Sequence, residues 1–211
     1  MTYLTLKEIT DCLQALGYTR VSELLNTTNP NLYIGPSNLL TENKIEFAQI
    51  YTKPIYTAKD LSVVYPDHHS WSRNSSLKFI ENDCCTDAAK DGTTMPLSNH
   101  MVAVFQLGRN LTSHVGIVHG GASASIIDEY FVKVVLPLTA NGFAVTANLS
   151  IKYLRPIKFQ VHERIVDVIL ECFVTNVVDS RKFTVVGGLM DKQGNKYCTA
   201  ELLVVVPQKP L

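Results

Sequence analysis

The sequence predicts an α+β domain in which one long helix packs against a five-stranded antiparallel sheet. The segment 120–136 is long enough for about five helical turns, it begins with small residues, and Pro137 follows it. One β-prone segment precedes this helix and four follow it. The later segments are joined by short polar turns, which favours antiparallel neighbours. A helix and a sheet of this kind bury their apolar faces against each other.

The predicted strands follow from alternation and from their bounding turns. The clearest is 145–153, where apolar residues at odd positions alternate with polar residues over nine residues, the period of a half-buried strand. The helix separates the first strand from this one, and turn-rich segments at 178–181 and 191–195 separate the last three. In chain order, the expected strands are 101–107, 145–153, 163–175, 182–190 and 196–206.

Residues 1–97 are expected to form an N-terminal extension, residues 98–207 the compact domain, and residues 208–211 a tail. The extension begins with a helix signature, because Thr5 and Glu8 have capping-box spacing and Gly17 can end the helix. The run 21–25 is a possible partner for this helix. The stretch 31–67 mixes short β-prone pieces with three prolines and predicts irregular cover over the domain. The apolar face of the helix consists of Leu6, Ile9, Leu13 and Leu16.

Composition indicates a globular intracellular protein. Nineteen basic and nineteen acidic residues give a formal net charge of zero, so nucleic acid and anionic membranes are not expected partners. Five cysteines without a C-x-x-C spacing argue against a disulfide framework. Residues 1–17 resemble neither a signal nor a transit peptide, and no apolar run could span a bilayer. A cytoplasmic location is expected, with a mitochondrial one as the alternative. An edge strand predicts a homo-oligomer.

The residues around the start of the long helix are the best candidates for chemistry. Gly120 and Gly121 would expose backbone N–H groups where the helix dipole adds partial positive charge, which suits an oxyanion. Asp128 lies about two turns further on, after two isoleucines, where lost solvation would suit a general base or a nucleophile. Each feature has a plain structural alternative: the glycines form only a tight turn, and Asp128 pairs with Lys133. Glu129 is expected to be solvated.

Other constellations are weaker. His68-His69 and the pair His114 and His119 have spacings compatible with a metal, but no third ligand is placed, so no metal or cofactor is predicted. Cys84-Cys85 is an ordinary thiol pair, and the helix serines lack the G-x-S-x-G context of a serine hydrolase. Gly187-Gly188 lies within a strand and indicates a bulge or a close approach of neighbouring backbone.

The sequence resembles a known family in this region. The residues that carry the resemblance are Val118-His119-Gly120-Gly121 with Asp128 nine positions after the histidine, then 145–149 and 153–156. They are similar to the hotdog-fold acyl-CoA thioesterases of the phenylacetic-acid-degradation type, nearest the branch with human thioesterase superfamily members 4 and 5 and uncharacterised fungal relatives. The resemblance covers about residues 98–207, and it implies a hotdog fold for the predicted helix and sheet.

The resemblance also implies roles. The Gly120 N–H would polarise the thioester carbonyl, Asp128 would be the catalytic carboxylate, and Thr146 would position water or that carboxylate. His119 would shape the loop at the carbonyl site. The implied substrate-binding residues are Gly121, Ser113 and Asn148.

The implied activity is hydrolysis of an acyl-CoA thioester to free acid and CoA, with no cofactor. A non-catalytic acyl-CoA or lipid-binding hotdog protein is the alternative. The implied assembly is a homodimer or a dimer of dimers, in which Asp128 of one subunit faces the Gly120 helix end of the other. Whether Asp128 acts as nucleophile or as general base is left open.

Overall fold

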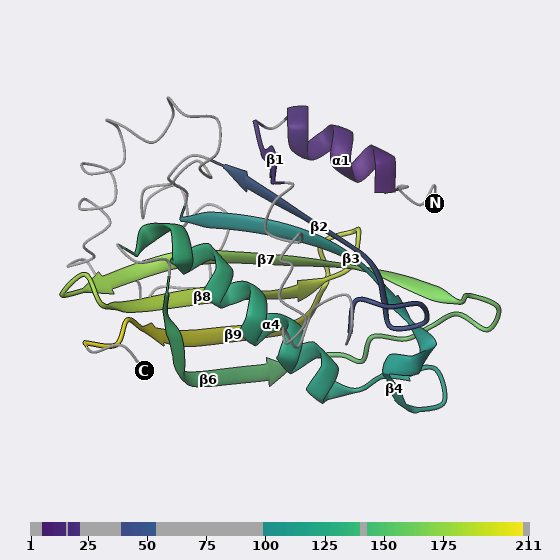
Figure 1. The fold of residues 1–211 in the computed structure, drawn as a ribbon. Coiled ribbons are helices and arrows are strands. Elements are labelled where there is room, and N and C mark those ends of the chain that lie inside the picture. Colours follow the sequence, from purple (N-terminus) through teal and green to yellow (C-terminus); the bar gives the residue numbers. More distant parts are fainter. Residues whose placement is uncertain (1–5, 16, 22–38, 54–98, 140–142, 209–211) are drawn as a thin grey trace.

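A long helix lying across one face of a large antiparallel sheet dominates the structure (Figure 1), a computed structural model that describes residues 6–15, 17–21, 39–53, 99–139 and 143–208. The helix is α4 (Gly120–Val135), and a short 3₁₀ turn, η3 (Leu136–Leu138), follows it. The sheet has seven strands in the order β1-β2-β3-β7-β8-β9-β6. Their bounds are β1 (Thr19–Val21), β2 (Ile45–Lys53), β3 (His100–Gly108), β6 (Val145–Tyr153), β7 (Ile165–Val178), β8 (Lys182–Met190) and β9 (Lys196–Val205).

The hotdog fold predicted for the second half of the chain is confirmed. Five contiguous strands, β3-β7-β8-β9-β6, surround α4, and every neighbouring pair is antiparallel. Alternate residues of β3 point towards α4 and join the main core, among them Phe105, whose ring meets Tyr130 of the helix edge to face. The α4 residues that fill this core are Ile126, Ile127, Tyr130, Phe131, Val134 and Val135.

The sheet is larger than predicted, because two strands from the N-terminal half extend it. The stretch 31–67 was expected to be irregular cover with short β-prone pieces at 45–51 and 61–65, but Ile45–Lys53 is the nine-residue strand β2, and it pairs with β3 along its length. Three prolines suggested irregular structure, yet Pro36, Pro54 and Pro66 all lie outside β2. Without β2, β3 would present a bare edge, and pairing satisfies its backbone groups. Within the same stretch, residues 39–44 form turns that lead into β2, and residues 31–38 and 54–67 lie outside the described residues.

The predicted N-terminal helix is confirmed as α1 (Leu6–Ala15), and it packs on the sheet face opposite α4. Ile9 and Leu13 contact Tyr51, Val102 and Val104 there. Thr10 adds a hydrogen bond of 2.8 Å between its hydroxyl and that of Tyr51. Gly17 has φ +83°, so it supplies the left-handed residue that ends the helix, as predicted. Thr5 of the expected capping box, Leu16 and residues 22–25 lie outside the described residues.

Two further features set the shape of the sheet. A Cβ at Gly187 would lie 2.0 Å from the Glu171 carbonyl oxygen, and one at Gly188 would lie 2.1 Å from that of Cys198, so the predicted close approach is confirmed. At the other edge, β6 pairs with β9 on one side and has no second partner strand in the described part of the chain, and most of its residues are exposed. Among the described helices, none is long and apolar enough to cross a bilayer.

Candidate active site

The start of α4 is held by a histidine cap that leaves one backbone amide unpaired. His119 is the N-cap residue, and its Nδ1 accepts a hydrogen bond of 2.8 Å from the Gly121 N–H. Of the six amides from Val118 to Ser123, Gly120 alone donates no hydrogen bond to a described residue. The other five bonds are Val118 to the Ile157 oxygen (3.0 Å), His119 to the Leu111 oxygen (2.7 Å), Gly121 to His119 Nδ1, and Ala122 (3.0 Å) and Ser123 (3.3 Å) to the His119 oxygen.

The unpaired Gly120 amide lies beside a small pocket. This cavity of about 40 Å³ is lined by Val118, Gly120, Ser123, Tyr153, Arg155, Pro156, Ile157, Tyr197 and Cys198. The Tyr153 hydroxyl donates a hydrogen bond of 2.8 Å to the Gly120 carbonyl oxygen. Burial raises the pKa of the Cys198 thiol, so this neighbour stays protonated at neutral pH and is not a thiolate nucleophile. The predicted oxyanion site is therefore an open amide at a helix N-terminus.

Asp128 is held by a threonine rather than by a lysine. The Thr146 hydroxyl donates a hydrogen bond of 2.6 Å to Asp128 Oδ1, while Oδ2 has no partner among the described residues. The alternative pairing of Asp128 with Lys133 is wrong, because Lys133 forms an ion pair of 2.9 Å with Glu129, one helical turn away. Glu129 was expected to be solvated, but its side chain is only 26% exposed. Asp128 itself is half-buried, so it is less desolvated than its two isoleucine neighbours suggested.

A β-bulge in β6 turns Thr146 towards α4. Regular alternation would place Thr146 on the face opposite Leu149, but the pairing with β9 shifts register between Thr146 and Asn148. Before the bulge the even positions therefore face the helix, and after it the odd positions do, so Leu149 joins the core. The predicted alternation is correct only after the bulge. A bulge changes no residue type, so the sequence pattern did not reveal it.

The same bulge separates two of the predicted site residues. Thr146 lies opposite Val204, which is buried against α4, whereas Asn148 lies opposite Leu203 on the other sheet face. Asn148 is exposed there and does not contact the site. Ser113 lies in the hairpin of β4 (Thr112–His114) and β5 (Ile117–Val118) and is also exposed. The structure thus brings together His119, Gly120 and Gly121, and separately Asp128 and Thr146, but neither Ser113 nor Asn148.

The two halves of the predicted site are far apart within one chain. Gly120 and Asp128 are eight residues apart on α4, which is about 12 Å along the helix axis. Gly120 is bonded to Tyr153 at the end of β6, and Asp128 to Thr146 near its start, so α4 and β6 run in opposite directions (Figure 1). A single thioester carbonyl could not touch both groups of one chain.

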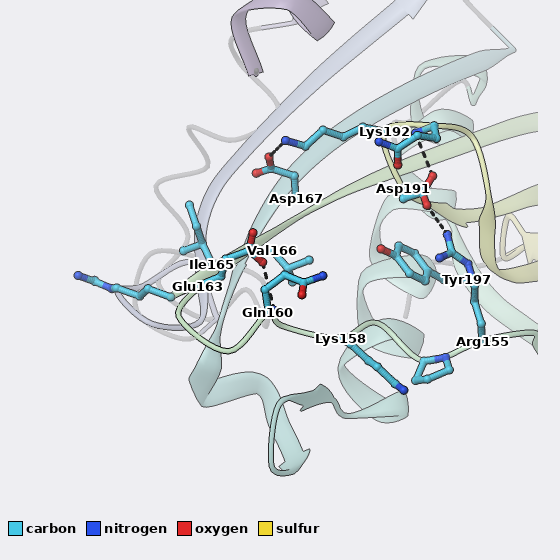
Figure 2. Close-up of a pocket in the computed structure, with 13 residues that line it drawn as sticks. Arg155, Lys158, Gln160, Glu163, Ile165, Val166, Asp167, Asp191, Lys192 and Tyr197 are labelled. Atoms are coloured by element: carbon cyan, nitrogen blue, oxygen red, sulfur yellow. Dashed lines mark hydrogen bonds and ion pairs between the residues drawn. The ribbon is translucent and has the colours of Figure 1, made fainter. Parts of the chain in front are cut away.

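A larger pocket adjoins the small one and shares Arg155, Pro156 and Tyr197 with it. This cavity of about 560 Å³ lies between the segment leading into β7 and the β8–β9 turn, and Figure 2 shows its side chains. Most of its charges are paired, including Arg155 with Asp191 (2.7 Å) and Lys192 with Asp167 (2.5 Å). Lys158 makes no ion pair with a described residue. Its full lining is Arg155, Pro156, Lys158, Gln160, Glu163, Arg164, Ile165, Val166, Asp167, Asp191, Lys192, Gln193 and Tyr197.

Arg155 anchors the segment between the two pockets. Its guanidinium lies over the Tyr197 ring, 4.1 Å from the centroid, and it also donates to the carbonyl oxygens of Asn195 and Lys196. Partial burial alone would raise the pKa of Asp191, but hydrogen bonds from the side chain and backbone of Asn195, then from Arg155 and the Gln193 amide, hold it below its usual range. Neither Arg155 nor Tyr153 was among the predicted site residues. Both stand in the 153–156 motif, which was the available signal.

The competing sites receive no support from the described residues. No three His, Cys, Asp or Glu side chains gather there in a way that could hold a metal ion. His114 and His119 are both exposed, and His119 instead caps α4. His68-His69 and Cys84-Cys85 lie outside the described residues.

Known proteins share this region of the chain. Residues 115–198 match the thioesterase superfamily. The acyl-coenzyme A thioesterase THEM4 of Mus musculus is 33% identical over 113 residues, 52% of this chain and 45% of that protein, and THEM4 of Rattus norvegicus is 31% identical over 114 residues, 53% and 46%. The chain therefore spans about half the length of these curated relatives.

Solved structures cover a similar share of this chain at lower sequence identity. A hypothetical thioesterase from Streptococcus pneumoniae TIGR4, crystallised with coenzyme A, is 19% identical, with 53% of this chain and 82% of that chain covered and a TM-score of 0.45. The E. coli PaaI protein from the phenylacetic acid degradation operon is 14% identical, with 52% and 73% covered and a TM-score of 0.45. The family match includes the whole of α4 and the strands β6, β7 and β8. Over residues 115–198, this chain is therefore similar to the thioesterase superfamily.

Proposed function

We propose that the protein is an acyl-CoA thioesterase that hydrolyses its substrate at a site shared by two copies of the chain. The observation that carries this proposal is that one helix holds both the Gly120 amide and the Asp128 carboxylate, and that this amide and one carboxylate oxygen bond to none of the described residues. Thioester hydrolysis needs both groups. A donor stabilises the negative charge that develops on the carbonyl oxygen, and a carboxylate activates water or attacks the carbon.

The exposed edge of β6 supports a two-chain site. Because α4 and β6 run in opposite directions, antiparallel pairing of β6 with the β6 of a second copy would bring Tyr153 of one chain towards Thr146 of the other. The Gly120 helix end of one chain would then approach Asp128 of its partner. A homodimer contains two such sites, and a dimer of dimers is compatible with the same pairing.

Each residue then has a defined part in the reaction. The Gly120 N–H and the helix dipole stabilise the oxyanion more strongly than the neutral carbonyl, which lowers the barrier. Thr146 occupies Asp128 Oδ1, so Oδ2 is the atom that takes a proton from water or attacks the thioester. Attack by Oδ2 would form an acyl anhydride and release the CoA thiolate, after which water would cleave the anhydride to the free acid. Both routes release the same products.

The larger pocket offers space for the CoA half of the substrate. It shares lining residues with the pocket at Gly120, and Lys158 there makes no ion pair with a described residue. The phosphates of CoA are anions that a lysine of this kind can bind as a point charge. The nature of the acyl chain is left open.

A panel of acyl-CoA esters with detection of the released thiol tests the proposed function. Turnover by the wild-type chain, lost in Asp128→Asn, supports it. Tight binding of acyl-CoA without any turnover would instead favour the non-catalytic binding protein. If the chain neither binds nor hydrolyses any ester in the panel, both the thioesterase and the binding protein are rejected.

A further inference from the structure

Tyr153 lies at the end of β6, directly against the start of α4. Its hydroxyl donates to the Gly120 carbonyl oxygen at 2.8 Å, and its ring is so close that a Cβ on Gly120 would lie 3.4 Å from two of its atoms. We propose that Tyr153 is a positioning residue that holds the Gly120–Gly121 peptide in place, so that the Gly120 N–H remains aimed at the substrate carbonyl. This inference rests on the proposed function and adds a residue to its oxyanion site.

The peptide between Gly120 and Gly121 is held at both of its polar atoms. Its oxygen accepts from Tyr153, and its N–H donates to His119 Nδ1. A peptide group is planar, so two bonds on opposite sides fix its orientation about the chain. Without the Tyr153 bond, the Gly120 oxygen would keep only the helical bond from the Ala124 amide, and the His119 ring would remain as the only side chain holding this peptide among the described residues.

A restraint matters here because both residues are glycines. Glycine allows a wide range of backbone angles, so a Gly-Gly step at a helix start samples several orientations of its amides. The preceding peptide is fixed differently: the His119 oxygen accepts from the Ala122 and Ser123 amides. Fixing both peptides leaves the Gly120 N–H as the open donor, which is the preorganisation that an oxyanion site needs.

The hydrogen bond from Tyr153 to Gly120 can affect activity without contributing to the hydrophobic core. Tyr153 is 53% exposed and lies outside the main core, so the loss of its hydroxyl leaves the packing of α4 unchanged. A tyrosine outside the site offers a matched control. Tyr51 lies on the sheet face opposite α4, and its hydroxyl makes a hydrogen bond of the same length, 2.8 Å, with that of Thr10.

The experiment compares Tyr153→Phe with Tyr51→Phe in chains labelled with ¹⁵N-glycine, which gives 11 glycine amides to follow. The Gly120 and Gly121 signals are identified from their disappearance in Gly120→Ala and Gly121→Ala. We expect Tyr153→Phe to speed hydrogen exchange of the Gly121 amide about threefold or more and to lower kcat about two- to tenfold with KM unchanged, the loss expected for one hydrogen bond. Tyr51→Phe, which also removes one hydroxyl hydrogen bond, should change neither the exchange of the Gly121 amide nor kcat.

The result that overturns the inference is unchanged exchange at Gly121 in Tyr153→Phe, because the bond would then not hold the peptide. Faster exchange of the Gly121 amide in Tyr153→Phe with unchanged kcat also overturns the inference, because the restraint on the peptide would then not affect catalysis. If the wild-type chain hydrolyses no acyl-CoA, the proposed function fails on its own, and the exchange rates still decide whether Tyr153 holds the Gly120–Gly121 peptide.

Discussion

The glycine at position 121 is required by the ring of the histidine that caps α4. A Cβ there would lie 2.8 Å from His119 Nδ1 and 2.9 Å from Cε1, closer than real contacts allow, so Gly121→Ala must push the ring away. The cap bond from the Gly121 N–H is then lost, which costs about 1 kcal/mol. At the same time, alanine stiffens the unfolded chain and stabilises the helix by about 0.4–1 kcal/mol. The two effects nearly cancel, so Gly121→Ala alone should change the free energy of unfolding little as long as His119 is present.

A double-mutant cycle separates them. His119→Ala removes the cap and should lower the free energy of unfolding by about 1 kcal/mol. With the ring gone, Gly121→Ala meets no obstacle, so the double variant should be more stable than His119→Ala alone, which gives a coupling energy of about 1 kcal/mol. Urea unfolding of the four chains measures this difference.

Gly120→Ala is the matched control in the same cycle. Its Cβ would lie 3.4 Å from the Tyr153 ring, an ordinary contact, and it would not touch His119. Its effect should therefore add to that of His119→Ala within about 0.5 kcal/mol. If Gly121→Ala and His119→Ala are additive to the same degree, the geometry assigned to the cap is wrong.

Three further predictions concern the site and its surroundings. Asp128→Asn should lower kcat at least about 100-fold with little change in KM, and Thr146→Ala should lower kcat about tenfold. Glu129→Gln should have the smallest effect, because Glu129 pairs with Lys133. Steady-state kinetics in which Glu129→Gln loses more kcat than Asp128→Asn would contradict the assignment. Asp191→Asn should destabilise the protein at pH 7, because hydrogen bonds hold the pKa of Asp191 in the folded state below its unfolded value. The difference in unfolding free energy between the two chains should persist above about pH 4 and fade as the pH falls towards the folded pKa. A difference that stays constant down to low pH would refute this prediction. At low salt, Lys158→Glu should raise KM for acyl-CoA about two- to fivefold. KM for the matching acyl-pantetheine, which lacks the CoA phosphates, should not change. An equal rise in KM for both substrates would exclude a contact between Lys158 and these phosphates.

The second half of the fold could be predicted because its local patterns agree with its tertiary structure. The α4 segment is apolar and bounded by Gly120 and Pro137, and the turns at 178–181 and 191–195 mark strand ends within about three residues. The strand β2 was underestimated because three prolines surround it, although none lies within it. Its partner β3 is distant in sequence, and pairing of that kind leaves no local signal.

The candidate site could be predicted only where its residues are neighbours in the sequence. His119, Gly120 and Gly121 are neighbours in the sequence, so their cap and open amide follow from local rules. The pairing of Thr146 with Asp128 depends on a bulge that alternation conceals, and the same bulge sends Asn148 to the other face. The division into extension and domain, and a cytoplasmic or mitochondrial location, stay predictions.

A purified heterodimer tests the shared site most directly. One chain carries Asp128→Asn, and the other carries Gly120→Pro, which deletes only the proposed donor: proline suits the first helical position, and His119 before it already has the extended backbone that proline requires. Two different tags allow the mixed pair to be isolated. If the site combines Gly120 of one chain with Asp128 of the other, one of the two sites is intact, and the heterodimer should recover about half of wild-type kcat while each parent dimer stays inactive. A heterodimer as inactive as its parents would contradict the shared site.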